Sequence, residues 1–376
     1  MHSLSDPIFR YTPEEYKRMK IILLLFTGFL LIIILTLITG KIINAQKFKI
    51  RSQKGIQKTK YITIGQIQQY IQIRGQDISN PIILMLHGGP GNNMAYYSYY
   101  WQADLERDYT IVHWDQRGCG NTYYLNKDAQ KPTLDLLLQD LDELVDHIRS
   151  EYHKEKIMIM GHSWGTFLGG IYSGTHPEKI SAYIPIGQML DFKKSEQVSA
   201  REAMRLADAA GKPKDAQKIV KKLELIMSCQ TLDKQNAKEF LRFRQLKEKY
   251  LPSQYSNKML LLQLFSPYMT FSDFKWMINF NALIESNSEL YQTLLSDERS
   301  SMYDHDPQYK IPVILIAGAD DWTTPYSMAL NYFNHISAPV KELITIENTG
   351  HLPFIDKTGE FSEMLLKTLD DVWCRV

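Results

Sequence analysis

The chain has 376 residues, and its 43 basic against 42 acidic side chains leave a net charge of +1 at pH 7. This length holds one large domain or two ordinary ones, and 44% hydrophobic with 23% charged residues is typical of a globular protein. The charge balance excludes a strongly basic protein, so we expect no nucleic-acid partner. The three widely spaced cysteines fit neither a disulfide framework nor a zinc site.

The first predicted element is an apolar stretch at residues 21–40, which contains no charged side chain. Twenty helical residues span roughly 30 Å, the hydrocarbon thickness of a bilayer. A buried core helix of this length would show a polar face. The apolar core of a cleaved signal peptide is normally shorter, although residues 43–45 would serve as a cleavage site. We therefore favour a single-pass membrane anchor over these two alternatives.

The side of the membrane on which the rest of the chain lies stays open. Lysine and arginine are more numerous after the apolar stretch than before it, which favours a cytoplasmic domain. The run Lys17-Arg18-Met19-Lys20 is instead typical of an export signal, which would place the domain outside. We assign residues 1–20 to an N-terminal tail and residues 41–60 to a basic linker.

Downstream of the linker, the sequence predicts strands and helices in alternation. Period-two patterns at residues 61–64 and 67–73 indicate an antiparallel hairpin. Short apolar runs predict strands covered on both faces, at residues 81–86, 110–114, 156–160, 182–186, 311–317 and 342–346. Helices are expected at residues 133–152 and 360–372. The predicted fold class is α/β, with a mostly parallel central sheet and helices on both faces.

One region interrupts this alternation. Residues 192–309 are polar, rich in lysine and glutamine, and helical in pattern, with apolar stripes such as Met259–Phe265 and Tyr268–Phe271. We interpret this region as a helical cap inserted into a single domain. The core of that domain then consists of residues 61–191 and 310–376.

A Gly-x-Ser-x-Gly motif at residues 161–165 follows a predicted strand and precedes a helix-like run. In that context the motif indicates a nucleophilic serine at the apex of a tight turn. Both glycines are needed, because a Cβ at either place would collide with the neighbouring strand or helix. Ser163 is therefore the candidate nucleophile.

A second glycine-rich motif, His87-Gly88-Gly89-Pro90-Gly91, follows the predicted strand at residues 81–86. Consecutive glycines let backbone N–H groups approach a developing negative oxygen. Gly88 and Gly89 are thus candidates for one half of an oxyanion hole, with the N–H of Trp164 as the other half. An ordinary Gly-Pro turn is the alternative interpretation.

A serine hydroxyl needs a histidine to take its proton and a carboxylate to fix that histidine. When a serine follows a strand in this way, the acid and then the histidine come later in the chain. Asp321 and His351 meet that order, and each lies on a loop after a predicted strand. We choose Asp321 over Asp320 because it lies three residues beyond Gly318 and four before Pro325.

Together these motifs resemble the proline iminopeptidase family of α/β-hydrolases. That family combines the His-Gly-Gly-Pro-Gly loop with an Asp-Gln-Arg-Gly-Cys-Gly segment, found here at residues 115–120, and a tryptophan after the nucleophile. The resemblance runs from about residue 60 to the C-terminus. It implies an α/β-hydrolase fold with a cap, and release of an N-terminal residue, often proline, from peptides. It implies no metal and no organic cofactor.

The chain departs from the family's pattern at three places. His162 replaces a glycine before the nucleophile, and Asn121-Thr122 replaces Arg-Ser. The cap also lacks the Trp-x-x-Trp-Glu segment that the family uses to hold the free amine of the substrate. Glu285 and Glu289 are the candidates to supply that charge here.

The sequence therefore predicts a membrane-anchored serine hydrolase that releases an N-terminal residue from short peptides through an acyl-enzyme. An esterase or acylglycerol lipase is the first alternative, because the anchor would place the site beside lipid. A non-catalytic binding protein on a hydrolase scaffold is the second. A serine in the turn argues against dehalogenase or epoxide-hydrolase chemistry, which uses aspartate there. The sequence does not predict an oligomeric state.

Overall fold

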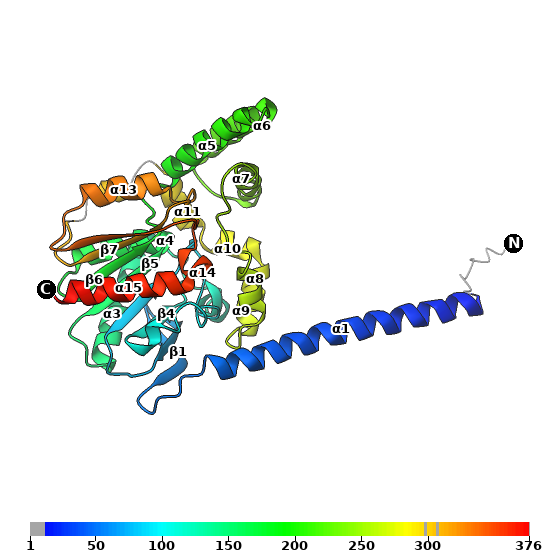
Figure 1. Ribbon diagram of the computed structural model, residues 1–376, viewed down its shortest axis with the longest axis horizontal. Coiled ribbons are helices and arrows are strands. Elements are labelled where there is room, and N and C mark those ends of the chain that lie inside the picture. Colours follow the sequence, from blue (N-terminus) through cyan, green and yellow to red (C-terminus); the bar gives the residue numbers. More distant parts are fainter. Residues whose placement is uncertain (1–11, 297–298, 306–307, 376) are drawn as a thin grey trace.

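The computed structural model describes residues 12–296, 299–305 and 308–375. An α/β domain carries a long N-terminal helix that projects away from it (Figure 1). Eight strands form one sheet in the order β1-β2-β4-β3-β5-β6-β7-β8. Their bounds are β1 Ile56–Ile64, β2 Ile67–Gly75, β3 Ile82–Leu86, β4 Thr110–Trp114, β5 Ile157–His162, β6 Ile180–Ile186, β7 Val313–Gly318 and β8 Lys341–Ile346.

The sheet is antiparallel at one edge and parallel elsewhere. Strands β1 and β2 form a hairpin in which Ile64 pairs with Ile67, and the two turn residues, Gly65 and Gln66, both have positive φ. Such a turn matches the twist of the flanking strands. Strand β2 pairs antiparallel with β4, and every neighbouring pair from β4 to β8 is parallel. The predicted α/β class with a mostly parallel sheet is confirmed.

The central strands are apolar because helices cover both faces of the sheet. In β3, Ile82 and Leu84 share a cluster on one side of the sheet with residues of α3 (Leu134–Glu151), α4 (Trp164–Thr175) and α13 (Tyr326–His335). On the other side, Ile83 and Met85 share a cluster with residues of α15 (Thr358–Trp373). Short helical segments η1 (Leu105–Arg107), α2 (Gly120–Leu125) and α14 (Pro353–Asp356) lie in the loops.

A helical insertion separates β6 from β7, in the region where the sequence predicts a cap. The two ends of the insertion lie next to each other, because Asp191 and Ser301 form an isolated antiparallel bridge. The insertion has its own apolar cluster around Ile219 and Phe243. Its helices are α5 Phe192–Ala209, α6 Pro213–Ser228, α7 Lys234–Lys247, α8 Met259–Leu264, α9 Phe271–Ile278, α10 Phe280–Ser286, α11 Ser288–Leu295 and α12 Met302–His305.

The projecting helix α1 (Pro13–Lys47) contains the predicted apolar stretch and extends beyond it at both ends. A capping box between Thr12 and Glu15 starts the helix, and none of its residues is buried. Its most apolar 18-residue window has a mean hydropathy of 3.2. By length and composition the helix is a candidate membrane span, a test that a signal sequence also passes. Residues 1–11 of the predicted N-terminal tail lie outside the described residues.

Candidate active site

Ser163 occupies the turn between β5 and α4, at the carboxyl end of the sheet. Its φ of +53° is a conformation that L-residues rarely adopt. Backbone hydrogen bonds hold it there: Ser163 N–H donates to the Ile186 carbonyl at 3.0 Å, and Thr166 N–H donates to the Ser163 carbonyl at 2.8 Å. The backbone thus fixes the strained position of the serine from both sides.

The two glycines of the motif are required by close contacts. A Cβ on Gly161 would lie 2.5 Å from the Gly165 carbonyl oxygen, and a Cβ on Gly165 would lie 2.1 Å from the Leu86 carbonyl oxygen. Real Cβ atoms essentially never come that close to backbone. The collision with the neighbouring strand and helix is therefore the one that the sequence predicts.

His351 and Asp321 meet at the ends of β8 and β7. His351 Nδ1 lies 2.8 Å from Asp321 Oδ2, and both side chains are buried. The other carboxylate oxygen accepts the N–H groups of Thr323 and Thr324 at 2.8 and 2.9 Å. Burial alone raises the pKa of Asp321, but the charge and hydrogen bonds of His351 and Thr324 outweigh it and lower the pKa. Asp321 is therefore an ionised acceptor for the histidine.

Asp320 has a different role. Its carbonyl accepts a hydrogen bond from the Gln254 side chain at 3.0 Å. The Gln254 amide oxygen in turn accepts the N–H of Trp322 at 2.6 Å, and the Gln254 carbonyl accepts the N–H of His351. Gln254 therefore ties the acid loop to the histidine loop, a role that no motif in the sequence indicated.

His162, the departure from the family's pattern, supports His351. Its ring centroid lies 4.6 Å from that of His351, and its Nε2 lies 2.9 Å from the His351 carbonyl oxygen. Because a carbonyl only accepts, Nε2 carries the proton. Burial and the nearby His351 lower the pKa of His162 to about 3, so the ring is neutral. His162 holds the backbone of His351 in place.

Ser163 and His351 line one cavity of about 370 Å³, together with Gly88 and Gly89. A Cβ on Gly88 would come within 3.2 Å of the Ser163 Cβ, so this loop lies directly against the serine. The backbone N–H groups of Gly88, Gly89 and Trp164 have no hydrogen-bond partner within the part of the chain that the structure describes. These three donors are the ones that the sequence assigned to an oxyanion hole.

The cap contacts the loop at residues 87–91, which we call the glycine loop. The indole N–H of Trp276, on α9, donates to the Gly91 carbonyl at 2.7 Å, and Trp276 also lines the cavity. Tyr96 and Tyr97 line the cavity as well, whereas Trp101 is a fully buried core residue. The aromatic segment at residues 96–101 thus contributes to both the site and the core.

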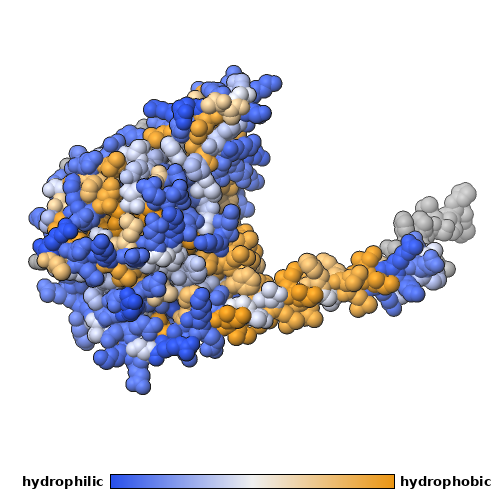
Figure 2. All heavy atoms as spheres, viewed as in Figure 1, coloured by the Kyte–Doolittle hydropathy of each residue, from blue (hydrophilic) through white to orange (hydrophobic). Residues whose placement is uncertain are grey.

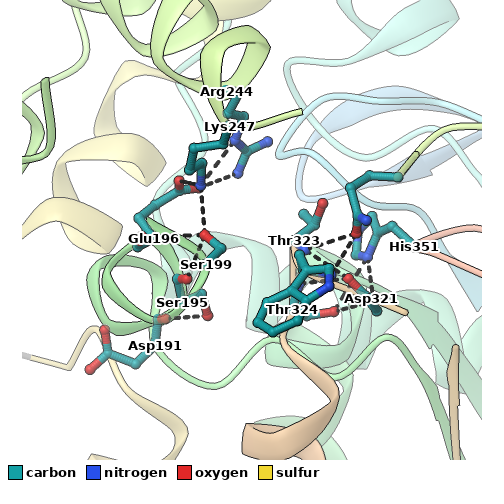
Figure 3. Close-up of polar contacts among 12 residues, drawn as sticks. Asp191, Ser195, Glu196, Ser199, Arg244, Lys247, Asp321, Thr323, Thr324 and His351 are labelled. Atoms are coloured by element: carbon teal, nitrogen blue, oxygen red, sulfur yellow. Dashed lines mark hydrogen bonds and ion pairs between the residues drawn. The ribbon is translucent and has the colours of Figure 1, made fainter. Parts of the chain in front are cut away.

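A second polar group reaches the cavity from the cap. Glu196, on α5, accepts hydrogen bonds from Arg244 at 2.7 Å and from Lys247 at 2.5 Å, both on α7. Glu196 and Arg244 line the cavity, while Lys247 lies behind them and also donates to Ser199. Figure 3 shows this group on the cap helices beside the group formed by Asp321 and His351.

In this group one carboxylate lies between two basic side chains. Burial alone raises the pKa of Glu196, but Lys247 and Arg244 together lower it below its usual value. The Arg244 guanidinium also lies 4.5 Å from the ring centroid of Phe240, within the range of a cation–π contact. Glu196 is therefore a carboxylate whose two oxygens are both engaged by cations.

The two glutamates predicted to bind the substrate's amine do not line the cavity that contains Ser163. Glu285 is exposed, lies 3.6 Å from Lys234 and borders a separate hollow beside Arg117. Glu289 borders another hollow, between the cap and the start of α3. The structure thus brings Ser163, Asp321, His351, Gly88, Gly89 and Trp164 together and leaves these two glutamates apart.

The Asp-Gln-Arg-Gly-Cys-Gly segment joins core and cap beneath the cavity. Asp115 Oδ2 accepts hydrogen bonds from the N–H of Asn121 at 2.8 Å and from its side chain at 3.0 Å. The same side chain donates to Asp273, on α9, at 2.7 Å. Burial and the neighbouring carboxyl raise the pKa of Asp115 to about 8, and burial raises that of Asp273. The described residues contain no group of three metal-binding side chains.

Comparisons with known proteins agree with this fold. Residues 81–358 match a family described as alpha/beta hydrolase fold. A probable aminopeptidase YbaC of Bacillus subtilis (strain 168) is 26% identical over 84% of this chain and 97% of its own length. A proline iminopeptidase of Lactobacillus acidophilus is 26% identical over 81% of this chain and 94% of its own. The resemblance to proline iminopeptidases is confirmed.

A solved structure of a bacterial membrane phospholipase A has the same fold. It superposes with a TM-score of 0.59 at 14% identity, and the match covers 96% of this chain and 99% of that one. The likeness therefore extends over nearly the whole length of both chains.

Proposed function

The chain belongs to the alpha/beta hydrolase fold family, and from this we propose that it is a serine hydrolase with Ser163 as nucleophile. The observation that carries the proposal is the convergence of three loops on one cavity. Ser163 is held at positive φ in the turn after β5, and His351, fixed by Asp321, lines the same cavity. This is the arrangement that serine activation requires.

In the proposed reaction, Ser163 Oγ attacks the substrate carbonyl carbon while His351 Nε2 takes the serine proton. Asp321 stays ionised and keeps the histidine Nδ1–H pointing toward itself, which leaves Nε2 for the serine. His351 then passes the proton to the leaving group, and the acyl-enzyme forms. Water, deprotonated by His351, attacks the acyl carbon and releases Ser163.

The negative oxygen of the tetrahedral intermediate needs hydrogen-bond donors that are already in position. We assign this role to the N–H groups of Gly88, Gly89 and Trp164. Each such donor typically lowers the barrier by roughly 3 to 4 kcal/mol. The contact of Gly88 with Ser163 supports this assignment, because it places the glycine loop at the reacting carbon.

For the substrate, we propose a peptide with a free N-terminus, on the strength of the relatives named aminopeptidase and proline iminopeptidase. Glu196 is the only acidic side chain among the described residues that line the cavity. An incoming ammonium would share this carboxylate with Arg244 and Lys247. Glu285 and Glu289 would have to move with the cap to take part.

An esterase or acylglycerol lipase is the second candidate, and the lining of the cavity favours it. Much of the cavity wall consists of apolar side chains from the cap, including Phe192, Met259, Phe280 and Leu283. The likeness to a membrane phospholipase A, over nearly all of both chains, supports the same candidate. Acyl chains would fit such a wall better than a charged amine would.

We further propose that α1 is a membrane anchor that stays on the mature protein. The helix continues through the apolar stretch into a segment that packs on the domain, where Asn44 donates to the Phe265 carbonyl at 3.0 Å. A signal peptide has no need of such contacts.

The test is a panel of prolyl, alanyl and other aminoacyl arylamides, their N-blocked counterparts, and short- and long-chain acyl esters. Turnover of free-amine arylamides that disappears on N-blocking and in Ser163→Ala establishes the aminopeptidase. Turnover of esters alone establishes the second candidate. Equal rates for wild type and Ser163→Ala would refute serine catalysis and favour the non-catalytic binding protein.

A further inference from the structure

Six large apolar side chains of the cap face solvent beside the base of α1. Figure 2 shows hydrophobic atoms gathered over α8 and α9, where the domain meets α1. We call this set the cap apolar face. Its members and their exposed fractions are Leu260 56%, Leu261 56%, Phe271 76%, Phe274 40%, Ile278 64% and Phe280 37%.

Elsewhere in the cap, exposed large apolar side chains are scattered, as at Leu225 on α6 and Leu241 on α7. The outer side of α5 is charged, with Arg201, Arg205 and Asp208 all exposed. Isolated exposed leucines are ordinary, but a group on three consecutive helices indicates an interaction site. The cap apolar face therefore needs a partner that covers large hydrocarbon side chains.

The position of α1 identifies that partner. The apolar stretch ends at Gly40, and a Cβ there would lie 2.2 Å from the Phe265 ring, so the helix touches the cap directly after α8. Asn44 donates to Tyr99 at 3.2 Å as well as to Phe265, and the Phe48 ring lies 5.1 Å from Tyr99. If residues 21–40 fill the hydrocarbon layer, the membrane surface lies at the level of Phe265, between α8 and α9.

Cations border the cap apolar face, as they do in interfacial membrane-binding segments. Lys275 Nζ lies 5.5 Å from the ring centroid of Phe271 and 4.4 Å from that of Tyr124. Lys41 follows the apolar stretch directly. Lysine and tyrosine around an apolar centre suit the headgroup layer of a bilayer.

We propose that the cap apolar face rests on the same bilayer that holds α1. The inference depends on the proposed anchoring, and it adds a second contact that fixes the orientation of the domain on the membrane. Other residues of the same helices line the cavity, namely Met259 and Gln263 on α8 and Trp276 and Met277 on α9. Phe280 belongs to both sets, so the cavity wall meets the membrane-facing surface at this side chain.

The test places a polarity-sensitive bimane probe on the full chain in lipid vesicles that carry a doxyl-labelled phosphatidylcholine quencher. The probe is attached at Phe271→Cys in a Cys374→Ser background. Cys119 and Cys229 are buried, which makes labelling selective. The matched control is the wild-type chain labelled at Cys374, which is exposed and close to the C-terminus on the side of the domain away from α1 (Figure 1).

We expect the doxyl lipid to reduce emission at position 271 by about twofold or more, with little change at position 374. Equal, weak quenching at both positions in chain that floats with the vesicles overturns the docking alone. A blue-shifted but unquenched probe at position 271 assigns the face to a second copy of the chain and also overturns it. Chain absent from the floated vesicles overturns the anchoring and the docking together.

Discussion

The core and the cap both line the cavity, but they hold their residues there by different means. In the core, backbone geometry places Ser163 and the glycine loop, and a substituent as small as a methyl group would collide. In the cap, long side chains reach one another across helices, as Glu196 reaches Arg244 and Lys247. The difference shows that local backbone shape holds the core side of the cavity, while side-chain contacts between residues distant in sequence hold the cap side.

The sharpest test of the core is Gly165→Ala. The added Cβ would lie 2.1 Å from the Leu86 carbonyl oxygen, so either α4 or β3 must shift. We expect the free energy of unfolding to fall by about 3 kcal/mol, and the hydrolysis established with the substrate panel to be lost. Denaturant unfolding and the substrate panel measure both.

The matched control is Gly359→Ala, in α15, where no atom lies within 4 Å of the added Cβ. Its stability should stay the same or rise by up to about 1 kcal/mol, since alanine favours helix. A Gly165→Ala protein as stable and active as this control would contradict the view that backbone geometry sets the core site.

This difference also explains what the sequence made predictable. The strands, the strained serine turn and the order of Asp321 and His351 leave local signals, because short apolar runs and single glycines encode them. Glu196 and Lys247 are separated by 51 residues, and only the packing of α5 on α7 brings them together. No local pattern reveals such a pair, and sequence reasoning selected Glu285 and Glu289 instead.

The support of His351 was likewise beyond local signals, whereas the start of α1 has a local signal of its own. A capping box at Thr12 and helix-forming residues after Gly40 extend α1 past its apolar stretch. In the sequence, His162 is only a departure from a family motif. The fold shows that its side chain contacts the His351 carbonyl. The contact between His162 and His351 joins residues 189 apart in sequence, while the capping box is a pattern within four residues.

The corresponding test of the cap is Glu196→Gln. Removing this buried carboxylate leaves Arg244 and Lys247 without their counter-ion, which typically costs about 3 kcal/mol. We expect hydrogen exchange to accelerate in α5 and α7 while β5 and α4 keep their protection. Mass spectrometry of the exchanged peptides locates the change.

Glu202→Gln, on the same helix, is the control for that experiment. Its partner Arg205 is largely exposed, so the loss should be less than about 0.5 kcal/mol. Faster exchange in β5 as well as in the cap would show that the two regions unfold together, and would remove the distinction drawn between them.

The smallest expected effect concerns Asp115 and Asp273, which meet where core and cap join. Asp115 has a raised pKa of about 8 in the folded chain, while in the unfolded chain it ionises near pH 4. Between these values the folded state keeps a proton that the unfolded state has lost. The stability that this retained proton contributes is therefore fully present below the pKa of the unfolded state. It is lost as the pH rises through the pKa of the folded state.

The measurable consequence is a slope in the free energy of unfolding between about pH 7 and about pH 8. One retained proton lowers stability by up to about 1.4 kcal/mol for each pH unit. The buried histidines do not offset this slope, because in the unfolded chain they are already neutral above about pH 6.5. Burial and the carboxyls of Asp115 and Asp273 raise the pKa values of Tyr70 and Cys119, so these two groups stay protonated.

Asp115→Asn should flatten this slope, because the amide cannot ionise yet still accepts the N–H of Asn121. Asp135→Asn, at an exposed aspartate that is ionised in both states, should leave the slope as it is in the wild type. If exchange at high pH accelerates in α9 alone, ionisation lifts the cap from the core, and the two regions respond separately. If Asp115→Asn keeps the full wild-type slope, Asp115 does not retain a proton in the folded state. The coupling of core and cap then lies in the contact between the glycine loop and Trp276 instead.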